Sequence, residues 1–208
     1  MSAPLASVGL LLAAYLLGGI SFSYLAGRMA RGVDLRDVGS GNLGATNVVR
    51  HLGWGWGVGV FALDILKGWV AVALAQRLGP PSAAAWLPVA AGLAAILGHS
   101  FTPYLGFRGG KGVATSAGVF LRLAPAATGL ALAVFLVVML LGRIVSLASL
   151  AAATALPLLL LWRRPDEHVL LGFALLIAVL IWVRHRSNLG RLLRGQEPRL
   201  SASRKGGA

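Results

Sequence analysis

Residues 98–115 form a polar, glycine-rich stretch between two strongly apolar segments (the central stretch). Its candidates for chemistry are three basic side chains and three glycines: His99, Arg108, Lys111, Gly109, Gly110 and Gly112. Glycine lets backbone N–H groups turn toward a ligand, and two permanent cations add full charge to those amides. This combination favours an anion, most simply a phosphate, with Thr115 as a further contact. The alternative is a basic loop that only marks the cytoplasmic ends of two membrane helices.

A first stretch, residues 40–50, combines hydroxyl, amide and glycine residues and ends on an arginine. Its candidates for substrate contact are Ser40, Gly41, Asn42, Thr46, Asn47 and Arg50. An arginine guanidinium binds phosphate through two parallel hydrogen bonds. Serine, asparagine and threonine are also preferred helix N-caps. The two roles are compatible, because a helix N-terminus itself binds anions.

The tail stretch, residues 184–197, is rich in arginine and contains His185, Asn188 and Glu197. A basic segment of this kind typically lies on anionic lipid headgroups. The same residues are placed to close over a phosphate site if all three stretches share one side of the membrane. Both roles stay open at this point.

Several enzyme classes are disfavoured by missing motifs. The chain has no cysteine, which excludes thiol catalysis, disulfides and iron–sulfur sites. It also lacks a His-x4-Asp dyad, an Asp-x2-Asp-Gly motif, a Gly-x-Ser-x-Gly nucleophile elbow and the glycine spacing of a Walker A loop. Clustered metal ligands are missing as well, so we expect neither a metal nor a cofactor.

The composition places these stretches in a membrane protein. Of 208 residues, 57% are hydrophobic and 12% are charged, and seven apolar segments fill most of the length. We therefore predict an all-α integral membrane protein with one domain, residues 1–208, and seven transmembrane helices. The expected spans are 7–29, 53–76, 83–97, 113–123, 126–141, 144–162 and 169–183. The first is too long for a cleaved signal peptide, and the fourth is short for a span.

Basic residues set the orientation. With seven spans and the N-terminus outside, fourteen of the 19 Lys and Arg residues fall inside, against four outside: Arg77, Arg122, Arg163 and Arg164. Six spans would separate the basic tail from the basic first loop, against the positive-inside bias. We therefore expect the N-terminus outside and residues 184–208 as a basic cytoplasmic tail, with the three stretches on the cytoplasmic face. This topology explains the net charge of +13 better than nucleic-acid binding does.

Asp64 and Lys67 lie within the second expected span. They are three residues apart, a spacing that lets them face the same way on a helix and pair. Charges inside a span normally point into a bundle or a polar cavity. An ion pair that positions the helix and a direct role in chemistry both remain open.

Together, the three stretches resemble the signatures of the bacterial acyl-phosphate:glycerol-3-phosphate acyltransferase family. The matching residues are Ser-Gly-Asn-Leu-Gly-Ala-Thr-Asn-Val-Val-Arg at 40–50, Gly-His-Ser-Phe with Phe-Arg-Gly-Gly-Lys-Gly-Val-Ala-Thr within 98–115, and Arg-His-Arg-Ser-Asn with Gly-Gln-Glu within 184–197. Order, spacing and flanking spans agree over nearly the whole chain. Leu43 and Arg108 differ from residues that are common at these positions in the family.

The resemblance implies that a fatty acyl group passes from acyl phosphate to the 1-hydroxyl of sn-glycerol 3-phosphate. The products are lysophosphatidic acid and phosphate, at the cytoplasmic face of a bacterial inner membrane, in the first step of phospholipid biosynthesis. Acyl phosphate is already activated, so no covalent enzyme intermediate is needed. Lys111, Arg50, Ser40 and nearby amides suit stabilisation of the developing charge.

Two routes for the proton of the attacking hydroxyl stay open. His99 is a candidate general base. The rival, which the resemblance favours, is transfer to a phosphate oxygen of glycerol 3-phosphate, with His99, His185 and Asn188 positioning the substrate.

A transporter of small anions or lipid phosphates is the competing class. It would carry charged or broken segments at the midplane of several spans, and only Asp64 and Lys67 approach that pattern here. The expected partners are acyl phosphate and glycerol 3-phosphate, without nucleic acid. No oligomeric state follows from the residues, and a monomer is consistent with them.

Overall fold

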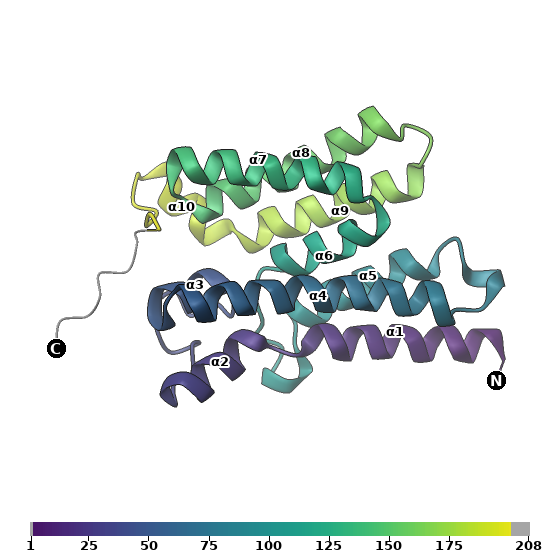
Figure 1. The fold of residues 1–208 in the computed structure, drawn as a ribbon, viewed down its shortest axis with the longest axis horizontal. Helices are drawn as coiled ribbons and strands as arrows, with labels where there is room; N and C mark the ends of the chain where they lie inside the picture. Colours follow the sequence, from purple (N-terminus) through teal and green to yellow (C-terminus); the bar gives the residue numbers. More distant parts are fainter. Residues whose placement is uncertain (1, 201–208) are drawn as a thin grey trace. The chain divides into compact units, whose positions relative to one another are not determined.

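The computed structural model describes residues 2–200, and every regular element in this range is a helix. The chain forms two compact units, Met1–Leu123 and Ala124–Ala208 (Figure 1). The first contains α1 (Ala3–Gly19), α2 (Phe22–Arg31), α3 (Ala45–Leu52), α4 (Trp54–Leu78), η1 (Pro81–Ala83), α5 (Leu87–Ser100), η2 (Pro103–Leu105) and α6 (Val113–Leu123). The second contains α7 (Pro125–Gly142), α8 (Val145–Arg163), α9 (His168–Arg184) and α10 (Arg186–Leu193).

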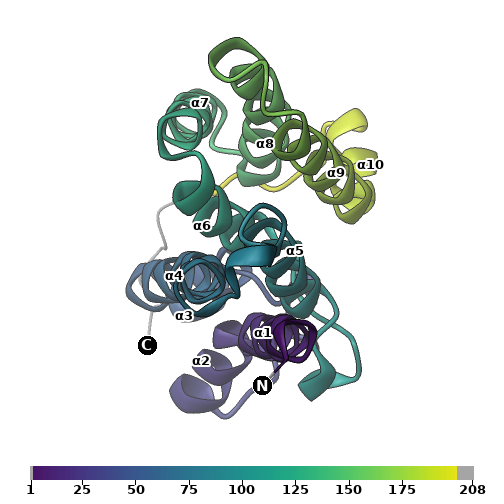
Figure 2. The same cartoon turned by 90° about the vertical axis from the view of Figure 1, so that its right-hand side faces the viewer.

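Three helices of the first unit, α1, α4 and α5, run alongside one another, and α6 packs against α4 (Figure 2). Their backbones approach so closely that the crossings have no room for side chains. A Cβ atom on Gly98 of α5 would overlap the carbonyl oxygen of Tyr15 in α1. One on Gly118 of α6 would overlap the carbonyl oxygen of Ile65 in α4. Such small residues are typical of helix contacts in membranes, where close packing holds the helices together.

The first apolar segment is broken, since α1 ends at Gly19 and α2 begins at Phe22. Backbone groups freed by the break have partners from elsewhere in the unit. The carbonyl oxygen of Gly19 accepts a hydrogen bond from Thr102 Oγ1 at 2.7 Å. That of Ile20 accepts one from Lys67 Nζ at 2.8 Å. Irregular backbone at membrane depth is stable only where other groups satisfy it in this way.

In the second unit, α7 packs on α8 and α8 packs on α9. Arg143 follows α7 in the left-handed conformation, with a φ of 54°, and turns the chain into α8. Helices α9 and α10 meet at His185 with a bend of 62°. The chain therefore leaves the direction of α9 where the tail stretch begins.

Four helices among residues 2–200 are long and apolar enough to cross a membrane, or five if the bent α9–α10 pair counts as one. They are Ala3–Arg31, which includes the break, and α4, α7 and α8. Helices α5 and α6, with 14 and 11 residues, are shorter than the roughly 20 residues of a typical span. The all-helical class and the predicted bounds 113–123 are confirmed. Seven spans, their orientation and a single domain stay predictions.

Candidate active site

The first stretch forms a loop and then helix α3. Asn47, buried in α3, donates from Nδ2 to the carbonyl oxygens of Leu35 and Val38, each at 3.1 Å. Its Oδ1 accepts the N–H of Ser40 at 3.3 Å. Both amide hydrogens are therefore used inside the loop. Asn47 therefore shapes this loop through its side-chain amide, and a contact of Asn47 with substrate stays a prediction.

Ser40 is exposed between two glycines in the left-handed conformation, with φ of 62° and 66°. Only glycine adopts this backbone without strain. Helix α3 is capped by Gly44 without a side chain, so Ser40 and Asn42 do not serve as its N-cap. Thr46 lies in the first turn of α3, and Arg50 is exposed in its last turn.

The central stretch forms the turn from α5 to α6. The N–H of Gly110 donates to the carbonyl oxygen of His99 at 3.1 Å, and the N–H of Gly109 donates to that of Ser100 at 3.2 Å. The prediction that these two amides face an anion is wrong, because both close the turn onto the end of α5. Glycine is required at these two positions because a side chain would not fit. A Cβ on Gly109 would overlap the His99 carbonyl oxygen, and one on Gly110 would overlap the His99 ring.

Lys111 lies half-buried just before α6. Gly112, with a φ of 83°, turns the chain into this helix, which begins at Val113. The first N–H groups of an α-helix have no partner within it, so a cation and a helix N-terminus lie next to each other. This is anion-binding geometry. Arg108 is exposed in the turn, and Thr115 is buried, with no hydrogen-bond partner for its Oγ1 among residues 2–200.

A buried polar cluster contacts His99 from the side of α4. Asp64 and Lys67 are each 2% exposed, and Lys67 Nζ lies 2.8 Å from Asp64 Oδ1. The pairing predicted from their spacing is confirmed. Lys67 Nζ also lies 3.0 Å from His99 Nδ1 and donates to the carbonyl oxygen of Ile20. His99 of α5 is thereby joined to α4 and to the break between α1 and α2.

The first and central stretches lie next to each other. The side-chain position of Gly110 faces the carbonyl oxygen of Leu43. Arg36 adds a second link, since its Nη1 donates to the carbonyl oxygen of Leu105 at 3.2 Å while Nη2 pairs with Asp34 at 2.7 Å. The hydrogen bond from Arg36 lowers the pKa of Asp34. This link was not predicted, and its sequence signal is the Asp-x-Arg spacing just before the first stretch.

The tail stretch belongs to the second unit, where Glu197 accepts hydrogen bonds from three side chains. The donors are Asn188 Nδ2 at 2.5 Å, Arg191 Nε at 2.7 Å and Ser146 Oγ at 2.8 Å. Burial raises the pKa of Glu197, but these three bonds together outweigh it, so the pKa is lowered. His185 is buried where α9 meets α10. The substrate contacts expected from His185, Asn188 and Glu197 stay predictions.

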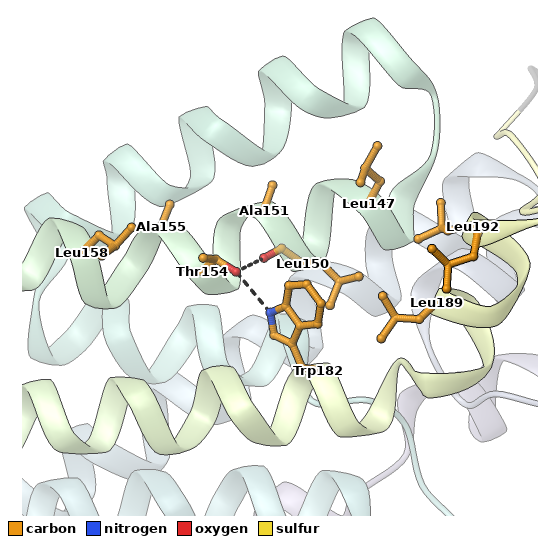
Figure 3. Close-up of a pocket in the computed structure, with 10 residues that line it drawn as sticks. Leu147, Leu150, Ala151, Thr154, Ala155, Leu158, Trp182, Leu189 and Leu192 are labelled. Atoms are coloured by element: carbon orange, nitrogen blue, oxygen red, sulfur yellow. Dashed lines mark hydrogen bonds between the residues drawn. The ribbon is translucent and has the colours of Figure 1, made fainter. Parts of the chain in front are cut away.

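The second unit also holds an apolar pocket of about 700 Å³ between α8, α9 and α10 (Figure 3). Leucine and alanine side chains make up most of its lining: Leu147, Leu150, Ala151, Ala155, Leu158, Leu189, Leu192 and Leu193. Inside it, Trp182 Nε1 donates to Thr154 Oγ1 at 3.1 Å, which satisfies the indole N–H. The pocket therefore suits a hydrocarbon chain and not a charged group.

Comparison with known proteins decides the family. Residues 8–195 match the sequence profile of the glycerol-3-phosphate acyltransferases. The chain is a member of the glycerol-3-phosphate acyltransferase family. Curated members from Synechococcus elongatus and Geobacter sulfurreducens are both 48% identical to it, over 202 and 191 residues. These alignments cover 94% and 91% of this chain and 95% of each relative.

Two solved structures of the glycerol-3-phosphate acyltransferase family are similar throughout. Both are crystal structures of PlsY, an integral membrane glycerol 3-phosphate acyltransferase, one in the glycerol 3-phosphate form and one in the lysophosphatidic acid form. Their TM-scores are 0.85 and 0.84 at 42% and 41% identity, over 94% of this chain and 96% of each PlsY chain. The resemblance seen in the sequence is confirmed, and the protein is an integral membrane glycerol-3-phosphate acyltransferase.

Proposed function

We propose that the protein transfers a fatty acyl group from an acyl phosphate to the 1-hydroxyl of sn-glycerol 3-phosphate. The products are lysophosphatidic acid and inorganic phosphate. One observation carries the proposal: the turn that ends in Lys111 meets the loop of Ser40 at Gly110 and Leu43. Two substrates that both carry phosphate need two anion sites at short range. The N-termini of α3 and α6 are suited to binding these two anions. Arg50 lies on α3, and Lys111 lies just before α6.

The chemistry is direct transfer. The 1-hydroxyl oxygen attacks the acyl carbonyl carbon, the bond from that carbon to the phosphate oxygen breaks, and the hydroxyl proton ends on the released phosphate. Phosphate is a good leaving group, so the protein has to hold two anions together and stabilise the charge that develops on the carbonyl oxygen and the leaving group. Lys111, Arg50, Ser40 and the first turn of α6 supply this stabilisation.

The proton first passes to a phosphate oxygen of glycerol 3-phosphate, and His99 positions that substrate. His185 and Asn188 of the tail stretch are further substrate contacts in this proposal, and Glu197, which accepts a hydrogen bond from Asn188, orients that side chain. In this scheme no side chain becomes acylated. The absence of a Gly-x-Ser-x-Gly elbow and of cysteine supports it.

We also propose seven spans with the N-terminus outside, in a bacterial inner membrane. The spans are Ala3–Arg31, α4, α5, α6, α7, α8 and α9. Support comes from the charge asymmetry, because an odd number of spans keeps the basic first loop and the basic tail on one side. The site then opens to the cytoplasm.

The donor is tested by giving the purified protein radiolabelled glycerol 3-phosphate with palmitoyl phosphate, palmitoyl-CoA or palmitoylated acyl carrier protein. We expect labelled lysophosphatidic acid from palmitoyl phosphate and none from the two thioesters. Product from a thioester at an equal or higher rate would contradict the proposal.

The anion site is tested by comparing two cations at opposite ends of α6. Lys111→Ala is expected to lower the rate with palmitoyl phosphate by about 100-fold or more, because a preorganised charge at the reacting groups is lost. Arg122 lies in the last turn of α6, and its guanidinium stacks on the Trp69 ring. Arg122→Ala is the matched control and is expected to keep the rate within about twofold. Equal losses in both variants would contradict a specific role for Lys111.

A further inference from the structure

The His99 imidazole presents Nδ1 to the buried cluster on α4. Lys67 Nζ lies 3.0 Å from Nδ1, within hydrogen-bonding distance, whereas Asp64 Oδ1 lies 3.6 Å from it, beyond that range. An ammonium group offers hydrogens and no lone pair. The contact with Lys67 is therefore a hydrogen bond only when Nδ1 carries the lone pair and accepts.

Lys67 is fixed in this position by two further groups. The carbonyl oxygen of Ile20 accepts a hydrogen bond from Nζ at 2.8 Å. Asp64 neutralises the charge at 2.8 Å, as an ion pair rather than an aligned hydrogen bond, since Oδ1 has no hydrogen-bond partner within residues 2–200. With Lys67 neutral, only a protonated His99 at 3.6 Å would balance the buried Asp64 carboxylate, and Lys67 at 2.8 Å is the nearer cation. The cluster therefore holds a charged donor against Nδ1.

We propose that Lys67 is a positioning residue that fixes His99 in the neutral tautomer with its proton on Nε2. Nε2 lies toward the turn, because a Cβ on Gly110 would overlap it and would also meet the carbonyl oxygen of Leu43. His99 then presents an N–H donor, and not a base, where the first and central stretches meet. An N–H donor at this position is suited to a phosphate or carbonyl oxygen of a substrate.

The consequence for the reaction rests on the proposed transfer from acyl phosphate, whereas the tautomer is a property of the free protein. With its proton on Nε2, His99 has no lone pair on the side of the turn. It therefore leaves the proton of the attacking hydroxyl to the substrate phosphate. The ion pair on α4, whose role the sequence left open, acts on the chemistry by orienting this one ring.

The tautomer is measured by long-range ¹H–¹⁵N correlation NMR on ¹⁵N-histidine-labelled protein without substrates. The His99 signals are assigned by their loss in His99→Gln. We expect an unprotonated Nδ1 and a protonated Nε2 in the wild-type protein. A proton on Nδ1, or on both nitrogens, would overturn the proposal whether or not any Lys67 variant folds.

The role of Lys67 is tested with Lys67→Met, which removes the donor and keeps the bulk. We expect the ring proton to move to Nδ1, toward Asp64, and kcat/KM for glycerol 3-phosphate to fall by at least about 10-fold, because the ring no longer donates to the substrate. Thr102→Val is the matched control, since it removes the other hydrogen bond to the break between α1 and α2 without touching His99. It is expected to leave the tautomer unchanged.

An unchanged tautomer in folded Lys67→Met, or a tautomer change in Thr102→Val as well, would overturn the role assigned to Lys67. Failure of the proposed acyl phosphate donor looks different. In that case the wild-type protein forms no lysophosphatidic acid from palmitoyl phosphate, yet the His99 tautomer and its dependence on Lys67 are still observed, which supports the positioning role alone.

Discussion

Glu197 is a buried carboxylate held by Ser146, Asn188 and Arg191. Its pKa is lowered in the folded protein, so the carboxylate stabilises the fold above the pKa of the unfolded chain. That contribution is lost as the pH falls through the lowered folded value, on the acid side of the ordinary glutamate range. Glu197→Gln is expected to lower the free energy of unfolding at neutral pH by about 1–3 kcal/mol and to flatten its decline in acid. Chemical unfolding in detergent micelles across this range measures both effects.

The matched control at the residue scale is Glu167, whose ion pair with Arg164 at 3.0 Å is exposed to solvent. Glu167→Gln is expected to change the free energy of unfolding by less than about 1 kcal/mol, because exposed pairs contribute little. If both variants lost the same stability and showed the same acid dependence as the wild-type protein, Glu197 would not be the acid-sensitive contact.

Residue types and local spacing predicted a good part of this chemistry. Asp64 and Lys67 were paired correctly because their spacing on one helix is a local property. His99, the third member of their cluster, comes from a different helix, and Ser146 is 51 residues from Glu197. Such partners depend on how helices pack, and no local pattern contains that information.

At the scale of helices, the contact of α1 with α5 depends on glycine. Gly98→Ala would place a Cβ onto the carbonyl oxygen of Tyr15, which belongs to backbone and has little freedom to move. We expect a loss of about 1–3 kcal/mol in the free energy of unfolding. We also expect reduced turnover, because Gly98 precedes His99 on α5. Thermal unfolding and the acyl transfer rate measure the two effects.

Gly9→Ala on α1 is the control for this prediction, because a Cβ at Gly9 meets no atom within 4 Å. It is expected to be neutral or slightly stabilising, since alanine is the better helix former. A Gly98→Ala variant as stable as Gly9→Ala would contradict this prediction, because it would show that α1 and α5 can move apart without loss in the free energy of unfolding.

The bounds of helices were predictable only where the chain carries its own stop signals. Helix α6 has the predicted bounds, between Gly112 and the Pro125 that begins α7. The break after Gly19 lies inside the segment 7–29, which was predicted as one span. The groups that stabilise the break, Thr102 and Lys67, come from distant parts of the chain, so no local pattern predicts them.

At the scale of the whole molecule, the proposed topology is tested by labelling from each side of the membrane. The chain has no cysteine, so a single introduced cysteine reports its own side of the membrane. With seven spans, Ser2→Cys is expected to react with an impermeant maleimide from outside the cell. Leu193→Cys, 89% exposed on α10, is expected to react only from the cytoplasmic side, in inverted vesicles. Labelling of both from the same side would indicate an even number of spans and contradict the proposed topology.

The central claim is that acyl phosphate donates directly to glycerol 3-phosphate at the site of Lys111. The most direct measurement is phosphate release from palmitoyl phosphate by the purified protein, with and without glycerol 3-phosphate, alongside the lysophosphatidic acid formed. We predict one phosphate for each lysophosphatidic acid, no release without glycerol 3-phosphate, and loss of both in folded Lys111→Ala. Release that does not need glycerol 3-phosphate, or no product from a folded wild-type protein, would contradict this account.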